Sequence, residues 1–389
     1  MSSGARWDVG GSMRRMDGLQ AWTYAAGFIL LASPALAVPT YTVTALGTLG
    51  GSFSFGQGIG SGGQVAGYAT TTGNASTRAF VYSGSAMQNL GTLGGTISSA
   101  YDVNASGQAT GYSTTTGNAA YRAFRYTGST MQSLGTLGGT SSYGYAINAS
   151  GHVAGESQTA GDGAFRAFRH NGTTMQSLGT LGGNDSTGRD INDAGYVTGY
   201  SYTPGDLATH AFLHNGTNML DLGTLGGTSS YGIAINDNAE VTGFSFTGGN
   251  SSVHAFFYDG STMQDLGTLG GTTSLGQGVN DSGYVVGYAD TASNVQRAFV
   301  HDGTTMYDLN TLVAPTDPLF GVINLIMAAA INDDGQIVAN SGNLAYLLTP
   351  VVASVPEEPT PAPEPATLAL LAIGAIGVAT VRRRSRAMA

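Results

Sequence analysis

The sequence contains no cysteine and no lysine, and only 10% of its 389 residues are charged. The lack of cysteine excludes disulfide bonds, thiolate metal sites and a cysteine nucleophile. All 14 basic residues are arginine, and half of them lie in the two end segments. The body between these ends keeps seven arginines against 19 acidic residues, so its net charge is close to −12. A field of that sign repels nucleic acid and anionic lipid, and neither is an expected partner.

The main feature of the chain is a repeated hexapeptide, Leu-Gly-Thr-Leu-Gly-Gly, whose six copies each begin 44 residues after the last. A decayed seventh copy occupies 309–312. A fixed period of this size is typical of a repeat architecture, in which one unit cannot bury its apolar face alone. The repeats predict one large domain over residues 38–350. The copies begin at Leu46, Leu90, Leu134, Leu178, Leu222 and Leu266.

Each repeat reads as four short strands. In the unit over 190–225, four apolar, alternating segments are separated by turn residues, among them Asn215-Gly216, a pair suited to a type I′ hairpin turn. Four strands in 44 residues is the period of a β-propeller blade. The strand before a recurring Asn-x-x-Gly turn carries small residues, which suit the crowded axis. The hexapeptide is then predicted to form the outermost strand.

The ends of the repeat region predict how the ring closes. The region opens at 41–46 with an outermost-type strand and ends at 344–348 with a third-type strand. Seven copies of the inner strand lie between them, and no capping unit of an open solenoid is visible. The sequence therefore predicts an all-β, seven-bladed propeller of four-stranded, 44-residue repeats, closed by its N- and C-terminal strands.

A tripeptide in the third strand of each repeat carries a family resemblance. It reads His210-Ala211-Phe212 and His254-Ala255-Phe256 in two units. The repeats resemble the HAF-repeat family of extracellular bacterial proteins. The resemblance implies an extracellular protein and no particular reaction. In four other units arginine replaces the histidine, at Arg78, Arg122, Arg166 and Arg297.

The N-terminal segment 1–37 is typical of a secretory signal peptide. Arg14-Arg15 precede a largely apolar run over 21–31, and Ala35 and Ala37 form an A-x-A cleavage site. Cleavage is expected after Ala37. The alternative is that the apolar run is a buried core strand.

The C-terminal segment has three parts. Five of the 15 residues in 351–365 are proline, which predicts a stiff, extended linker. An uncharged stretch over 366–381 follows, which as a helix would span about 24 Å at ~1.5 Å per residue. This is slightly short of the ~30 Å hydrocarbon core. An arginine cluster then completes the segment 366–389, and positive charge of this kind stays in the cytoplasm.

This tripartite tail resembles the PEP-CTERM sorting signal of Gram-negative bacteria. The resemblance implies cleavage by an exosortase-type membrane protease, transient inner-membrane anchoring, and release to the cell surface. The membrane would then be contacted only through the C-terminal helix before processing. The alternative is a permanent anchor. The residues that carry the signal are Pro363, Glu364, Pro365, Arg382, Arg383 and Arg384.

Three features of the body were considered as ligand sites. The Arg/His column of the third strands could bind acidic sugars, although structural bonding to neighbouring carbonyls is favoured. Turns such as 332–335 could bind calcium, but they offer too few oxygens, and a simple turn is the better interpretation. The insertion at 313–326 is either a ligand-binding rim loop or a plug that helps to close the ring.

The chain offers no recognisable catalytic motif, cofactor site or metal-ligand set. The expected function is therefore a non-enzymatic one. The sequence predicts an exported cell-surface or matrix propeller that binds or structures extracellular polysaccharide. The alternative is a polysaccharide lyase or hydrolase that uses channel residues, since propellers also host enzymes.

Overall fold

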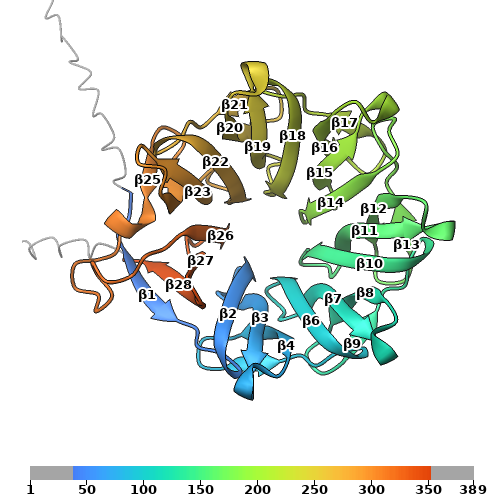
Figure 1. Ribbon diagram of the computed structural model, residues 1–389, viewed down its shortest axis with the longest axis horizontal. Coiled ribbons are helices and arrows are strands. Elements are labelled where there is room, and N and C mark those ends of the chain that lie inside the picture. The colour runs from blue at the N-terminus through green and yellow to red at the C-terminus, as the bar shows by residue number, and fades with distance from the viewer. Residues whose placement is uncertain (1–37, 352–389) are drawn as a thin grey trace, which may run out of the picture. The chain divides into compact units, whose positions relative to one another are not determined.

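The computed structural model describes residues 38–351, and these fold into strands arranged around a central axis (Figure 1). Four successive strands form one blade, running outward from the axis. The innermost strands are β2 (Gly50–Ile59), β6 (Gly94–Val103), β10 (Gly138–Ile147), β14 (Ser186–Ile191), β18 (Gly226–Ile235), β22 (Gly270–Val279) and β26 (Met327–Ile331). The second strands are β3 (Val65–Thr71), β7 (Ala109–Thr115), β11 (Val153–Thr159), β15 (Val197–Tyr202), β19 (Val241–Thr247), β23 (Val285–Thr291) and β27 (Ile337–Ser341).

The outer half of each blade completes the antiparallel sheet. The third strands are β4 (Thr77–Tyr82), β8 (Tyr121–Tyr126), β12 (Phe165–His170), β16 (Thr209–His214), β20 (Val253–Tyr258), β24 (Gln296–His301) and β28 (Leu344–Pro350). The outermost strands are β5 (Met87–Asn89), β9 (Met131–Ser133), β13 (Met175–Ser177), β17 (Met219–Asp221), β21 (Met263–Asp265), β25 (Met306–Asp308) and β1 (Tyr41–Ala45).

The prediction of a seven-bladed propeller is wrong, because the strands do not group into seven four-stranded sheets. Five blades of the described residues stand as separate four-stranded sheets. The strands from β18 to β25 instead form a single eight-stranded sheet. The cause is a parallel pair between Val253 of β20 and Thr273 of β22, which joins two neighbouring groups of strands.

The N- and C-terminal strands of the repeat region pair with each other. β1 lies antiparallel to β28, with Tyr41 opposite Pro350 and Ala45 opposite Tyr346. The last blade therefore contains strands from both ends of the region, in the order β1-β28-β27-β26. This pairing was predicted from the types of the first and last strands.

The hexapeptide does not form the outermost strand, and this prediction was wrong. The outermost strand is the three-residue segment before it, and the hexapeptide crosses to the next blade, where its last two glycines begin the inner strand. Leu90 is 6% exposed and packs with Leu93 between two blades. Because Leu90 is buried and Leu93 is partly buried at the blade interface, the segment is a crossing rather than an exposed edge. Gly91 (φ +78°) and Gly94 (φ +99°) supply the left-handed backbone of this crossing.

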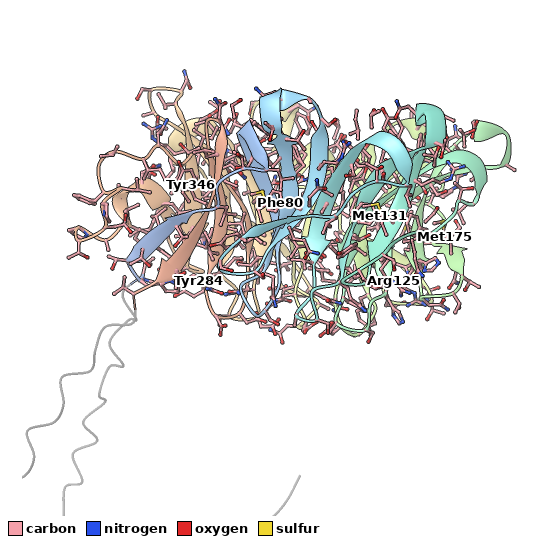
Figure 2. The ribbon with its side chains drawn as sticks, turned by 90° about the horizontal axis from the view of Figure 1, so that it is seen from below. Phe80, Arg125, Met131, Met175, Tyr284 and Tyr346 are labelled. Carbon is pink, nitrogen blue, oxygen red and sulfur yellow. The ribbon has the colours of Figure 1, made fainter. Side chains whose placement is uncertain are left out.

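The core lies between adjacent blades. The alanine and phenylalanine of the repeated tripeptide are fully buried at 0% exposure, as at Ala79 and Phe80, the latter labelled in Figure 2. Burial of a phenylalanine side chain stabilises the fold by about 1.5–3 kcal/mol. A buried serine on every innermost strand except β26 also joins neighbours: Ser98 Oγ accepts from Ala79 N (2.9 Å) and donates to Gly91 O (2.6 Å). Ala-Phe therefore recurs in the sequence because it forms the inter-blade core.

Helical structure in residues 38–351 is limited to short 3-10 turns. They are η1 (Thr72–Asn74), η2 (Thr116–Asn118), η3 (Ala160–Asp162), η4 (Pro204–Asp206), η5 (Gly248–Asn250) and η6 (Leu309–Thr311). Over this part of the chain no helix has both the length and the apolar character to cross a bilayer. The C-terminal transmembrane-type helix expected over 366–381 is not supported, because that stretch lies outside the described residues. The expected signal peptide (1–37) and most of the linker (351–365) also lie outside them.

Candidate functional site

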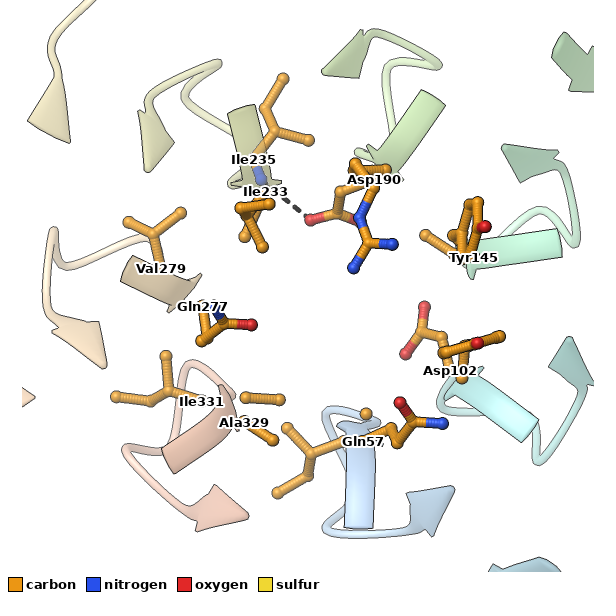
Figure 3. Close-up of a pocket in the computed structure, with 18 of the residues that line it drawn as sticks. Gln57, Asp102, Tyr145, Asp190, Ile233, Ile235, Gln277, Val279, Ala329 and Ile331 are labelled. Carbon is orange, nitrogen blue, oxygen red and sulfur yellow. Dashed lines mark hydrogen bonds between the residues drawn. The ribbon is translucent and has the colours of Figure 1, made fainter. Parts of the chain in front are cut away.

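A cavity of about 240 Å³ lies on the axis of the ring, walled by the innermost strands (Figure 3). Each of these strands carries a β-bulge next to the cavity. In β10, for example, Gly144 pairs with Gly155 and Ala146 with Ala154, so Tyr145 has no partner of its own. Bulges redirect a side chain, and here they direct one residue per strand to the axis. The bulge residues that line the cavity are Gln57, Tyr101, Tyr145, Arg189, Ile233, Gln277 and Ala329.

The wall of this cavity is polar on one arc and mostly apolar on the other (Figure 3). The polar arc runs through β2, β6, β10 and β14, and it contains the only charged lining residues among those described. The apolar arc runs through β18, β22 and β26, interrupted by Gln277. Apolar walls with a few placed polar groups are typical of ligand sites. The polar arc consists of Gln57, Tyr101, Asp102, Tyr145, Arg189 and Asp190, and the apolar arc includes Ile233, Ile235, Val279, Ala329 and Ile331.

Arg189 is the cation of this cavity. Its guanidinium carbon lies 4.5 Å from the centre of the Tyr145 ring, a cation–π arrangement. The Nε atom of Arg189 is buried and has no hydrogen-bond partner. Within residues 38–351 the ion pairs are His210–Asp221, His254–Asp265 and Arg297–Asp308, so Arg189 is held by stacking rather than by a carboxylate.

Two aspartates face the same cavity, and each joins neighbouring inner strands. Asp102 accepts hydrogen bonds from Val103 N (2.8 Å) and from Ile147 N of the next strand (2.9 Å). Asp190 does the same with Ile191 N (2.8 Å) and Ile235 N (2.8 Å). Desolvation raises the pKa of Asp102 to about 7, with a contribution from the charge of Asp190. Desolvation likewise raises the pKa of Asp190 to about 6.

A group of five tyrosines extends from the cavity wall to the protein surface; we call it the tyrosine cluster. Tyr101 and Tyr145 line the cavity with ring centres 5.1 Å apart. Tyr143 continues the cluster at 5.5 Å from Tyr112 and 5.7 Å from Tyr121. Tyr121, on β8, is 40% exposed. The cluster offers a continuous aromatic surface that leads into the polar arc.

Glu156 of β11 fixes the position of the cluster. It accepts a hydrogen bond from Tyr145 Oη (2.9 Å) at one oxygen and from Thr187 Oγ1 (2.6 Å) at the other. Both oxygens of this carboxylate are therefore engaged. Desolvation raises the pKa of Tyr101 and of Tyr143 to about 12.

A second cavity, of about 200 Å³, lies on the axis at the Asn-x-x-Gly turns. Asn148 Oδ1 accepts from His152 N (2.9 Å) and closes its own turn, while Asn148 Nδ2 donates to Asn192 O of the next blade (3.0 Å). The same bond repeats around the axis and ends at Gly60 O, which accepts from Asn332. These asparagines have a structural role, because both the oxygen and the nitrogen of each side-chain amide are hydrogen-bonded. The donors of this series are Asn104, Asn148, Asn192, Asn236, Asn280 and Asn332.

Aspartates line the same cavity beside the asparagines. Asp193 N donates to Asp237 Oδ1 (2.8 Å), and Asp281 N donates to Asp333 Oδ1 (2.9 Å). Within the described residues no group of three or more acidic or histidine side chains is placed to hold a metal ion. The turn over 332–335, considered above for calcium, thus supplies a carboxylate oxygen to a backbone amide.

The Arg/His column lies on the third strands, away from the axis. Arg78 and Arg166 donate to carbonyl oxygens of the next blade, at Thr96 and Asn184, as the structural interpretation predicts. The histidines differ, because His254 Nδ1 pairs with Asp265 Oδ2 of its own blade at 2.8 Å. None of these residues lines either cavity.

The insertion at 313–326 packs against the closing strand. Asp317 Oδ2 accepts from Val43 N (2.8 Å), and Ala314 N donates to Tyr41 O (2.8 Å). It contributes no lining residue to the two axial cavities. These contacts favour the closure interpretation over the rim-loop one.

The predicted sorting and cleavage residues lie outside the described residues. They are Ala35, Ala37, Pro363, Glu364, Pro365, Arg382, Arg383 and Arg384. The cavity-lining residues were missed by the sequence analysis. Their signal was present: the residue three places before each turn asparagine varies, whereas its neighbours repeat.

Comparisons with known proteins address the C-terminal tail and the fold. Residues 361–384 match the model described as "PEP-CTERM protein-sorting motif". This finding confirms that part of the predicted resemblance, while the HAF-repeat resemblance stays a prediction. No curated protein matches the sequence.

Several solved structures are similar to this chain at low sequence identity. The β-propeller domain of the Trilobed protease from Pyrococcus furiosus is 11% identical, with 69% of this chain and 83% of that chain covered and a TM-score of 0.48. A streptogramin B lyase is 11% identical, with 80% and 98% covered and a TM-score of 0.48. The BP39L lectin from Burkholderia pseudomallei is 8% identical, with 80% and 98% covered and a TM-score of 0.42. Similarity this low carries no information about ligand or activity.

Proposed function

We propose that this protein is an exported cell-surface or matrix propeller that binds exopolysaccharide without reacting with it. The observation that carries the proposal is the tyrosine cluster, which joins an exposed aromatic surface to the polar arc of the axial cavity. One face of a sugar ring is made of C–H groups and packs on aromatic rings, while its hydroxyls require hydrogen-bond partners. An aromatic surface beside polar side chains meets both needs.

The sorting motif supports the cellular setting of this proposal. A PEP-CTERM motif at 361–384 is the mark of an exported protein in Gram-negative bacteria, and such signals are processed by an exosortase. We propose cleavage near Pro363-Glu364-Pro365, after transient anchoring in the inner membrane, and delivery of the propeller to the cell surface.

The hydrogen bonds made by the cavity carboxylates support binding rather than catalysis. Both oxygens of Asp102 and both oxygens of Asp190 accept backbone amides. A general acid or base must reach the substrate within hydrogen-bond distance, and these groups are committed to the inner strands.

The alternative is a polysaccharide lyase or hydrolase, and one observation favours it. Asp102 and Asp190 face one cavity with pKa values raised to about 7 and about 6, and paired carboxyl groups of this kind serve glycosidases. Shorter oligosaccharides or unsaturated ends released from incubated polysaccharide would establish the enzyme and reject the binding proposal.

Retention of purified protein on exopolysaccharide extracted from the producing bacterium tests the proposal directly. We expect retention by the unmodified protein and at least a several-fold loss in Tyr121→Ala. Tyr202→Ala is the matched control, because Tyr202 is 38% exposed, like Tyr121 at 40%, but lies outside the tyrosine cluster. Equal retention of both variants would show that the cluster is not the binding surface.

A further inference from the structure

The residues that line the axial cavity differ among the repeats, although the strand that carries them recurs in each. We call the bulge residue of each innermost strand, which lines the cavity, the wall position. The residue before the wall position is always small, as at Gly144 and Gly188. The residue two places after it is always a β-branched aliphatic, as at Ile147 and Ile191. The wall position itself varies among the strands: it is glutamine in two, tyrosine in two, and arginine, isoleucine and alanine in the others, and only Arg189 is charged. Packing and turn formation restrict the repeated positions, whereas the bulge releases the wall position from pairing. The wall is therefore shaped for an asymmetric ligand.

Arg189 brings to this wall a hydrogen-bond donor, its Nε atom, that has no acceptor in the structure. A guanidinium carries five N–H donors and strongly favours a charged acceptor. Its Nε is buried and unpartnered, and its plane is held on the Tyr145 ring. The adjacent carboxylates of Asp102 and Asp190 accept backbone amides, and neither comes within 4.0 Å of Arg189 as an ion pair in the described residues. A buried donor without an acceptor is unfavourable, and a ligand oxygen would relieve it.

The size of the cavity restricts what enters it. At about 240 Å³ it is below the roughly 300–1,000 Å³ that is typical of sites enclosing a whole small molecule. It can admit one group of a larger ligand. The rest of that ligand would lie on the tyrosine cluster, because Tyr101 and Tyr145 belong to both the cluster and the cavity wall.

The charges of the body are distributed unevenly and favour an anion on this side of the ring. Residues 38–192 contain six arginines and five acidic residues, whereas residues 193–350 contain one arginine and 14 acidic residues. The tyrosine cluster and Arg189 belong to the first set. The strong negative charge of the second set repels anions and leaves the first as the approach for a negatively charged chain.

From these observations we infer that the ligand is a carboxylate-bearing sugar, a uronic acid unit, whose carboxylate binds Arg189 while its ring packs on the tyrosine cluster. This inference rests on the proposed glycan binding and adds the chemical class of the sugar. Guanidinium and carboxylate match as a two-bond pair, which a neutral hydroxyl cannot reproduce. Gln277, on the opposite wall, is placed to contact the same sugar (Figure 3).

Titration of the purified full-length protein with matched monosaccharides tests the inference. The probes are D-glucuronate and D-galacturonate, compared with D-glucose and D-galactose, and with acetate as a carboxylate without a ring. We expect both uronates to bind at least 10-fold more tightly than the neutral sugars, which lack the carboxylate that pairs with Arg189. We expect the same margin over acetate, which lacks the ring that packs on the tyrosine cluster. Arg189→Gln should lower uronate affinity to the level of the neutral sugars, and Arg189→Lys should restore part of it.

Arg169→Gln is the matched control, because it removes the same charge from a residue that donates to Gly195 O outside the axial cavity. This variant should keep uronate affinity, and melting curves of all variants check that they fold. Equal binding of uronates and neutral sugars, unchanged in Arg189→Gln, would overturn the carboxylate inference and leave glycan binding in place. Acetate binding as tight as uronate binding would replace the sugar site by a small-carboxylate site. If no monosaccharide binds while the protein is still retained on exopolysaccharide, the uronic acid inference fails and the proposed glycan binding stands. If the protein binds neither monosaccharides nor exopolysaccharide, both proposals fail.

Discussion

The side-chain amide of Asn236 donates to the backbone oxygen of Asn280 at 2.9 Å, and so connects two turns that are 44 residues apart. The same asparagine accepts from Glu240 N at 2.9 Å and closes its own turn. One residue therefore determines both a local turn and the spacing of adjacent inner strands.

Loss of this side chain should destabilise the ring. In Asn236→Ala the buried carbonyl of Asn280 and the partly buried amide of Glu240 lose their partners, which costs about 1–3 kcal/mol for the buried group and less for the other. Asn238→Ala, two residues later in the same turn, removes one bond from an exposed side chain and should cost less than about 1 kcal/mol. Urea unfolding of the two variants measures the difference, and equal free energies of unfolding would show that the axial asparagines are dispensable.

The cavity carboxyls should make stability depend on pH. The pKa of Asp102 is raised to about 7 in the folded protein from an ordinary value of 3.8, so the folded state holds a proton that the unfolded state has lost. The free energy of unfolding should therefore fall as pH rises from about 4 to 7, by up to about 1.4 kcal/mol per pH unit for this group. Asp102→Asn should flatten that slope even if it lowers stability overall.

Asp259 provides the control for this measurement. Backbone and hydroxyl donors of Ser261 and Thr262 hold the pKa of Asp259 well below its ordinary value. Its proton binding differs between the folded and unfolded states only below about pH 5, so Asp259→Asn should leave the slope between pH 5 and 7 unchanged. An unchanged slope in Asp102→Asn would mean that the Asp102 carboxyl is not desolvated.

The histidine and the phenylalanine of the repeated His-Ala-Phe tripeptide should contribute very differently to stability, because the first is partly exposed and the second is in the core. The side chains of His254 and Asp265 are 20% and 43% exposed, and partly exposed pairs contribute little, so His254→Ala should cost less than about 1 kcal/mol. Phe256 is fully buried, and Phe256→Ala should cost about 3–5 kcal/mol. Both variants should keep glycan binding in the cold, and loss of binding with unchanged melting in His254→Ala would place the column in the binding site.

The sorting motif predicts the C-terminus of the mature protein. Mass spectrometry of surface material should find no peptide beyond about residue 365, because cleavage is expected near Pro363-Glu364-Pro365. Recovery of peptides from 367–381 in that fraction would establish a permanent anchor. Alanine replacement of the three motif residues should leave the protein in the membrane fraction.

The features that were predicted correctly depend on local chemistry. The Asn-x-x-Gly turns, the period-two strands and the pairing of β1 with β28 follow from patterns of a few residues that repeat at a constant spacing. The sorting motif is likewise a contiguous signal. Local backbone preferences and short motifs are present in the chain before it folds.

The errors concern interactions between units. The hexapeptide was predicted to be outermost because the small residues before the Asn-x-x-Gly turn suit the axis, yet Leu90 is buried between blades, and burial there depends on the neighbouring repeat. The parallel pair between Val253 and Thr273, which merges two groups of strands into one sheet, is also a contact between repeats.

The sequence alone thus determined the repeat unit, its turns, the closing strands and the sorting tail. Only the tertiary structure decided which residues face the axis. A bulge in each inner strand directs one side chain inward, and whether a bulge forms depends on the register with the second strand. The ring then brings Arg189 over Tyr145 from the preceding inner strand, 44 residues earlier, because equivalent positions of neighbouring strands meet only when the ring is assembled.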